Sequence, residues 1–303
     1  ATTLADGCYQ SMFKGCTSLT QAPELPATTL ADYCYSHMFE DCTSLTQAPE
    51  LPATTLAERC YEEMFSGCTS LTQAPELPAT TLADYCYQSM FSGCTSLTQA
   101  PELPATTLAD YCYKSMFLGC TSLTQAPKLP VTTLAYSCYY GMFEICTSLT
   151  QAPELPATTL AEACYDFMFS GCTNLSEIRV AFVEWKKGDN TYFWVENVAP
   201  TGTFYSPKAL PLEYGLDRIP EGWTVKYIDE GTGVNDAVAS ETTVWTEGNT
   251  IYVRDSEGDV EVYDMLGRLI VSKRNGQENI QIPVPQKGIY VVKVGTETHK
   301  VEL

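Results

Sequence analysis

A 26-residue repeat constrains this sequence more than any other feature. The first copy, ATTLADGCYQSMFKGCTSLTQAPELP, occupies residues 1–26, and near-copies begin at Ala27, Ala53, Ala79, Ala105, Val131 and Ala157. Seven copies thus fill residues 1–182. Units of this length bury their apolar face only by stacking on neighbours, so the repeat predicts a solenoid. Because the first residues already belong to the motif, we expect further sequence before Ala1.

Within each copy the first half predicts a helix. Thr3 stands three residues before Asp6, which is the spacing of a capping box. Gly15 stands where the C-terminal cap of a helix takes positive φ. Between them, unvarying residues follow a helical period and predict one buried stripe: Leu4, Ala5, Cys8, Met12 and Phe13. Positions 6, 7, 10, 11 and 14 of the copy vary and predict the exposed helix face.

The second half of each copy predicts a short strand-like edge. Cys16, Leu19, Ala22 and Leu25 recur every three residues, and prolines interrupt the segment. We therefore expect an α/β solenoid of seven 26-residue repeats, with a helix on one side and a strand edge on the other.

The charge balance excludes several classes of partner. The chain has 17 Lys and Arg against 37 Asp and Glu, a net charge of −20. Such a surface repels nucleic acids and anionic lipid headgroups. No apolar run reaches the roughly 18 residues of a membrane span. Two His residues make general-base and zinc chemistry improbable. We predict no catalytic residue, cofactor or metal, and neither nucleic-acid binding nor membrane insertion.

All 14 Cys residues lie in the repeats, two per copy. Three interpretations remain open: buried free thiols, which the apolar pattern favours; disulfides, which suit an exported protein; and metal ligands, which the spacing of eight does not match. The columns are Cys8, Cys34, Cys60, Cys86, Cys112, Cys138 and Cys164, and Cys16, Cys42, Cys68, Cys94, Cys120, Cys146 and Cys172.

Other local patterns favour structural roles. Cys34 and His37 resemble a nucleophile and base, but the pattern turns Cys34 inward and His37 outward. The segment 255–259 predicts a hairpin turn and not a calcium loop. Gly231-Thr232-Gly233 lacks the context of a phosphate loop. The tyrosine column that begins at Tyr9 predicts packing between copies, with its hydroxyls at the solvent.

The strand edge carries the candidate binding site. Its Thr, Gln and Glu recur in every copy, whereas the helix face changes, so a repetitive partner could follow only the edge. Hydrogen bonding between neighbouring copies is the alternative role of this ladder. The candidate residues are Thr20, Gln21, Glu24, Thr46, Gln47, Glu50, Thr72, Gln73, Glu76, Thr98, Gln99, Glu102, Thr124, Gln125 and Lys128.

The pattern C-x-x-L-x-x-A-x-x-L-P, with the preceding M-F-x-G-C, resembles the BspA-like (Treponema-type) leucine-rich repeats of bacterial surface proteins. Ala22 stands where that family usually has Ile or Leu, which suggests a tighter inner edge. The aromatic-rich residues 183–228 resemble the segment that closes such arrays, and a solenoid needs such a cap.

The composition changes after the cap. Residues 229–240 are small and polar and predict a linker. Residues 241–303 alternate with period two and predict a small all-β antiparallel sandwich. The runs VYDMLGRLI and QKGIYVVKV and the closing HKVEL resemble the C-terminal sorting domains of type IX secretion substrates in Bacteroidetes. This resemblance implies export, with the export machinery as a partner of this domain.

These observations favour a non-enzymatic protein that is secreted or exposed on the outer cell surface. The family resemblance implies an adhesin-like role, in which the repeats bind an extracellular protein or glycan. A structural spacer or stalk without a specific ligand is the alternative. A hydrolase would need paired carboxylates in a cleft, and the sequence indicates none.

Overall fold

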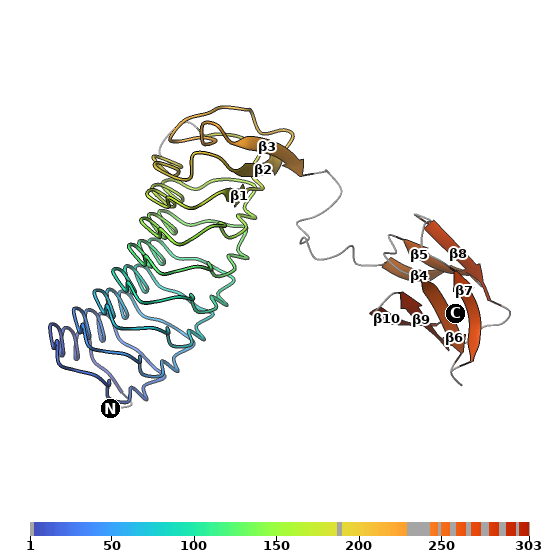
Figure 1. Ribbon diagram of the computed structural model, residues 1–303. Helices are drawn as coiled ribbons and strands as arrows, with labels where there is room; N and C mark the ends of the chain where they lie inside the picture. The colour runs from blue at the N-terminus through green and yellow to red at the C-terminus, as the bar shows by residue number, and fades with distance from the viewer. Residues whose placement is uncertain are drawn as a thin grey trace. The chain divides into compact units, whose positions relative to one another are not determined.

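The computed structural model describes residues 3–186, 190–228, 243–247, 250–254, 259–264, 268–273, 279–284, 289–294 and 297–302 (Figure 1). The chain forms two compact units, Ala1–Gly231 and Thr232–Leu303. We call them the repeat unit and the C-terminal unit. The predicted linker at 229–240, the Gly231–Gly233 segment and most of the predicted turn at 255–259 lie outside the described residues.

Residues 6–15 of each copy form a run of overlapping turns. N–H groups at even positions donate to the carbonyl three residues earlier, as Met12 does to Tyr9 at 3.2 Å. N–H groups at odd positions donate to the next copy, as Tyr9 does to the carbonyl of Cys34 at 3.0 Å. The turns thus use half of their donors locally and half between copies. Each layer therefore depends on the next layer to satisfy its backbone.

The predicted helix, and with it the α/β description of the solenoid, was wrong: the described residues contain strands and turns but no helix. The backbone takes positive φ at every fourth residue, for example at Tyr33 (57°), His37 (56°) and Asp41 (59°). An α-helix requires negative φ throughout. A four-residue turn period and a 3.6-residue helix period select nearly the same apolar positions, which is why the sequence pattern suggested a helix.

The conserved apolar columns fill the core of the repeat unit. Beyond the first copy, the Cys, Tyr, Met and Phe residues of these columns are at most 2% exposed. Equivalent rings stack between copies, with centroids 5.6 Å apart for Phe39 and Phe65 and 6.0 Å apart for Tyr35 and Tyr61. The tyrosines pack between copies as predicted, but they are buried and do not reach the solvent. The stacked columns make the core continuous along the unit.

The strand edge consists of isolated parallel bridges and not of long strands. Gln21 pairs with Gln47, and Gln47 pairs with Gln73. Farther along, Gln151 pairs with Glu177, the first residue of β1 (Glu177–Arg179). Parallel pairing then continues through β2 (Thr203–Pro207) and β3 (Thr224–Ile228).

The turn pattern extends beyond residue 182. The Phe169 N–H donates to the carbonyl of Trp194 at 2.9 Å, and Asn197 repeats the positive φ at 56°. The Trp194 side chain is fully buried, with its ring 6.5 Å from Tyr165 and 6.1 Å from Phe169. Residues 190–197 therefore cover the apolar face of the seventh copy.

The C-terminal unit contains two antiparallel sheets, with strand orders β10-β9-β6-β7 and β4-β5-β8. The antiparallel strands that the period-two alternation of residues 241–303 predicted are present. Ile251, Val262, Ile282 and Val292 come from both sheets and share one core. The strands are β4 (Thr243–Glu247), β5 (Thr250–Arg254), β6 (Val260–Asp264), β7 (Leu269–Lys273), β8 (Asn279–Pro283), β9 (Ile289–Val294) and β10 (Glu297–Glu302).

Candidate functional site

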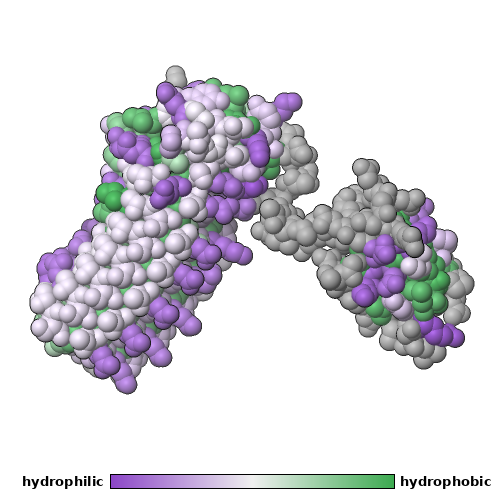
Figure 2. All heavy atoms as spheres, viewed as in Figure 1, coloured by the Kyte–Doolittle hydropathy of each residue, from purple (hydrophilic) through white to green (hydrophobic). Residues whose placement is uncertain are grey.

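All fifteen predicted ladder residues, from Thr20 to Lys128, are exposed on the side of the repeat unit that carries the bridges. Part of the ladder also connects neighbouring copies: the Thr124 hydroxyl donates to the carbonyl of Thr98 at 3.2 Å. Backbone groups of the glutamines form the bridges. Figure 2 shows hydrophilic side chains at regular intervals along one edge of the unit.

Grooves lie between consecutive Ala-Pro-Glu-Leu-Pro segments at this edge. One groove of about 320 Å³ is lined by Pro23, Glu24, Pro49 and Glu50, among others. A similar groove of about 290 Å³ lies two copies farther along, where Glu76 and Glu102 occupy the same positions. Proline rings and glutamate side chains therefore line these grooves together.

The carboxylates of this edge carry most of its charge. Glu154 pairs with Arg179 at 3.5 Å. Among the described residues, Glu24, Glu50, Glu76 and Glu102 have no ion-pair partner. Equivalent residues in stacked copies lie about 5 Å apart. Like charges at that spacing repel one another, which favours a cationic partner at this edge.

The cysteines are not an accessible reactive site. Twelve of the 14 are buried, and the exposed ones are Cys8 and Cys16 in the first copy. Thiols of the second column donate to the preceding copy, as Cys68 Sγ does to the Phe39 carbonyl at 3.1 Å. Burial raises the pKa of Cys34 to about 11, which opposes a thiolate nucleophile beside His37. The burial of Cys34 therefore adds to the sequence pattern as a reason why Cys34 and His37 do not form a catalytic dyad.

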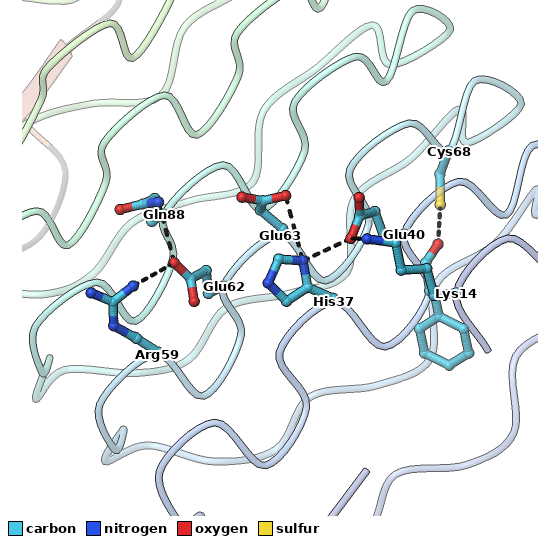
Figure 3. Close-up of polar contacts among 9 residues, drawn as sticks. Lys14, His37, Glu40, Arg59, Glu62, Glu63, Cys68 and Gln88 are labelled. Carbon is cyan, nitrogen blue, oxygen red and sulfur yellow. Dashed lines mark hydrogen bonds and ion pairs between the residues drawn. The ribbon is translucent and has the colours of Figure 1, made fainter. Parts of the chain in front are cut away.

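A charged cluster on the turn side was not predicted from the sequence (Figure 3). His37 Nδ1 lies 2.7 Å from Glu40 Oε2 and 3.4 Å from Glu63 Oε2. Lys14 Nζ reaches the same Glu40 oxygen at 2.7 Å. Three copies contribute to the cluster, so spacing within one copy could not reveal it. The sequence signal that could have revealed the cluster is a comparison of positions 11 and 14 between adjacent copies, because the side chains at these positions lie next to one another.

The neighbouring Arg59 belongs to a second network. Its guanidinium lies 3.8 Å from the centre of the Tyr85 ring and 2.8 Å from Glu62 Oε1. Gln88 Nε2 donates to the same oxygen at 3.2 Å. These groups engage one another, although Arg59 Nε and Gln88 Oε1 are buried without a hydrogen-bond partner.

The structure defines the class of the protein: a scaffold of stacked repeats that is followed in the chain by a separate antiparallel β domain. Residues 8–124 match the BspA type leucine rich repeat region in six copies, and residues 245–302 match the secretion system C-terminal sorting domain. The chain thus carries BspA-type repeats and a type IX sorting domain, as both resemblances predicted. No curated protein and no solved structure matches it.

The two family matches define the broad role of the chain. The sorting domain implies secretion and attachment at the cell surface, in agreement with the prediction, and is consistent with an origin in Bacteroidetes. Repeats of the BspA type generally act as non-enzymatic scaffolds for protein interaction. Within the described residues, no helix is long and apolar enough to cross a membrane.

Proposed function

We propose that this protein is an adhesin-like binding protein, without enzymatic activity, whose ladder edge binds a basic extracellular macromolecule. The observation that carries the proposal is the regular, exposed row of Thr, Gln and Glu along stacked copies. An extended partner can make the same contact at each copy, so weak individual contacts add along the row. The turn side changes from Lys14 to Glu40 to Leu118 and offers no such regularity.

The chemistry of the edge favours a protein segment rich in Lys or Arg. Glu24, Glu50, Glu76 and Glu102 supply unpaired carboxylates, and the proline-lined grooves between them can accept the aliphatic part of a long basic side chain. Lys128 replaces the glutamate in the fifth copy, so the charge pattern differs between the two ends of the edge. A sulfated or otherwise anionic glycan fits this charge pattern poorly.

A spacer without a specific ligand is the second candidate. The observation in its favour is that bonds such as Thr124 to Thr98 use ladder groups between copies. The side-chain carboxylates do not take part in the bridges, and near-identity of the copies by itself favours neither candidate.

Binding to an array of extracellular-matrix proteins and glycans separates these candidates. We expect saturable binding of the full chain to basic proteins on the array, with no binding by residues 241–303 alone. Binding should weaken as salt screens the carboxylates. An array without any saturable partner would favour the spacer.

We also propose a separate role for each segment of the chain. Residues 1–182 form the binding array, residues 183–228 its cap and residues 229–240 a linker. Residues 241–303 form a β-sandwich recognised by the export machinery. Deletion of 241–303 in a host with type IX secretion should retain the protein inside the cell, whereas unchanged surface display would contradict this assignment.

A further inference from the structure

The cluster of His37, Glu40 and Glu63 places three metal-ligating side chains on one surface of the repeat unit. Their candidate ligand atoms, one nitrogen and two carboxylate oxygens, all lie within 4.8 Å of one another. Figure 3 shows the imidazole between the two carboxylates. The side chains are 24%, 15% and 30% exposed, so the cluster is sheltered but accessible to an ion.

The spacing of these atoms is close to that of a metal coordination shell. Zinc binds imidazole nitrogen and carboxylate oxygen at about 2.0–2.2 Å, so tetrahedral ligands lie about 3.4 Å apart. The separations from His37 Nδ1 are already 2.7 Å to Glu40 Oε2 and 3.4 Å to Glu63 Oε2. Small side-chain rotations would therefore suffice to surround an ion.

The local charge also favours a cation. The carboxylates of Glu40 and Glu62 add negative charge near Glu63. Lys14 supplies one positive charge to Glu40. Its side chain is 47% exposed, and it can turn toward the solvent when another cation binds. Asp41 adds a further negative charge near Lys14.

We propose that His37 Nδ1 and carboxylate oxygens of Glu40 and Glu63 bind a divalent transition-metal ion, of which Zn²⁺ fits best. Imidazole and carboxylate ligands suit Zn²⁺, Co²⁺ and Ni²⁺, whereas Ca²⁺ and Mg²⁺ prefer oxygen alone. Three protein ligands leave a coordination position for water or for a group on a partner. Position 11 is His in the second copy alone of the seven, so the repeats would hold one such site.

The repeat supplies matched variants for a test. Position 11 is Ser in three copies (Ser11, Ser89 and Ser115), and position 14 is also Ser in three copies (Ser66, Ser92 and Ser170). His37→Ser removes the nitrogen ligand, and Lys14→Ser removes the competing ammonium. Glu102→Gln removes a carboxylate on the opposite edge and serves as the control. Melting temperatures without metal show whether each variant folds.

The experiment is calorimetric titration of the full chain with Zn²⁺ in excess Mg²⁺, which occupies nonspecific acidic sites. We expect one ion per chain, at least tenfold weaker binding for His37→Ser, tighter binding for Lys14→Ser and no change for Glu102→Gln. A Co²⁺ spectrum should lack the thiolate charge-transfer band that ligation by exposed Cys8 and Cys16 would produce. Binding that is unaffected by His37→Ser, a thiolate band, or no uptake by the Lys14→Ser variant would overturn the proposal.

Discussion

Buried thiols and phenols occupy adjacent positions in every copy after the first, and their protons stabilise the folded state. Burial raises the pKa of Cys68 to about 12 and of Tyr35 to about 12. An unfolded Cys ionises near 8.5. Because the folded pKa is the higher one, the unfolded chain releases protons first as the pH rises. The stabilisation is therefore complete below about pH 8.5 and is lost progressively toward pH 12.

We expect the free energy of unfolding to be nearly constant between pH 7 and 8 and to fall steeply above about pH 9, as many buried thiols and phenols add to the effect. Urea unfolding at a series of pH values measures this dependence under reducing conditions. A free energy of unfolding that does not change up to about pH 10.5 would show that these groups are not buried as described.

The same burial predicts the result of thiol titration. We expect the native protein to react rapidly at about two thiols, the exposed Cys8 and Cys16, and the denatured protein to react at close to 14 without a reducing agent. A denatured count near zero would instead establish disulfides.

At the scale of the turns, positive φ decides which residue fits each position. Gly93 takes φ of 71° at position 15, and Ile145 takes φ of 62° at the same position of a later copy. A β-branched residue is strained in this conformation. The Ile145 side chain is 46% exposed, so little of its apolar surface contributes to packing.

We expect Ile145→Gly to be more stable than Ile145→Ala by about 1 kcal/mol, because only glycine relieves the strain. The two variants lose the same packing to within a methyl group. In a helix the order would be reversed, with Ala favoured by about 1 kcal/mol. Chemical denaturation of both variants thus tests the turn structure, and a more stable Ala variant would contradict it.

The sequence could predict the repeat length and the buried columns, because apolar side chains such as Cys34, Met38 and Phe39 keep their places in every copy. It could not predict the backbone that joins them. Most residues with positive φ at positions 7 and 11, such as Tyr33 and His37, are not glycines, so these positions give no consistent local signal. The strand-edge residues could be identified as candidates because they recur, whereas the His37 cluster depends on contacts between copies.

For the whole molecule, the two units have separate cores, one of stacked repeat residues and one that includes Ile251 and Val292. Trp194, β2 and β3 already cover the seventh copy. The repeat unit should therefore not need the C-terminal unit for stability.

We expect truncation after Asp229 to leave the repeat unit soluble, with a melting temperature within a few degrees of that of its transition in the full chain. Calorimetry of both proteins makes the comparison. Aggregation of the truncated chain or a much lower melting temperature would show that the two units share a core.

The central claim is that the ladder edge, and not the turn side, binds the partner. Glu50→Lys, Glu76→Lys and Glu102→Lys together reverse the charge of the edge. Glu162→Lys, Glu184→Lys and Glu221→Lys change exposed carboxylates elsewhere and match the change in net charge. Arg59→Tyr, Glu62→Gln and Glu63→Ser give the third copy the residues that the fourth copy has at positions 7, 10 and 11.

The most direct test measures the affinity of these three variants and the unmodified chain for the basic protein selected on the array. We expect the edge variant to bind at least tenfold more weakly with nearly unchanged melting temperature, and the other two variants to retain more of the affinity. Binding that survives reversal at the edge but is lost in the turn-side variant would contradict the claim.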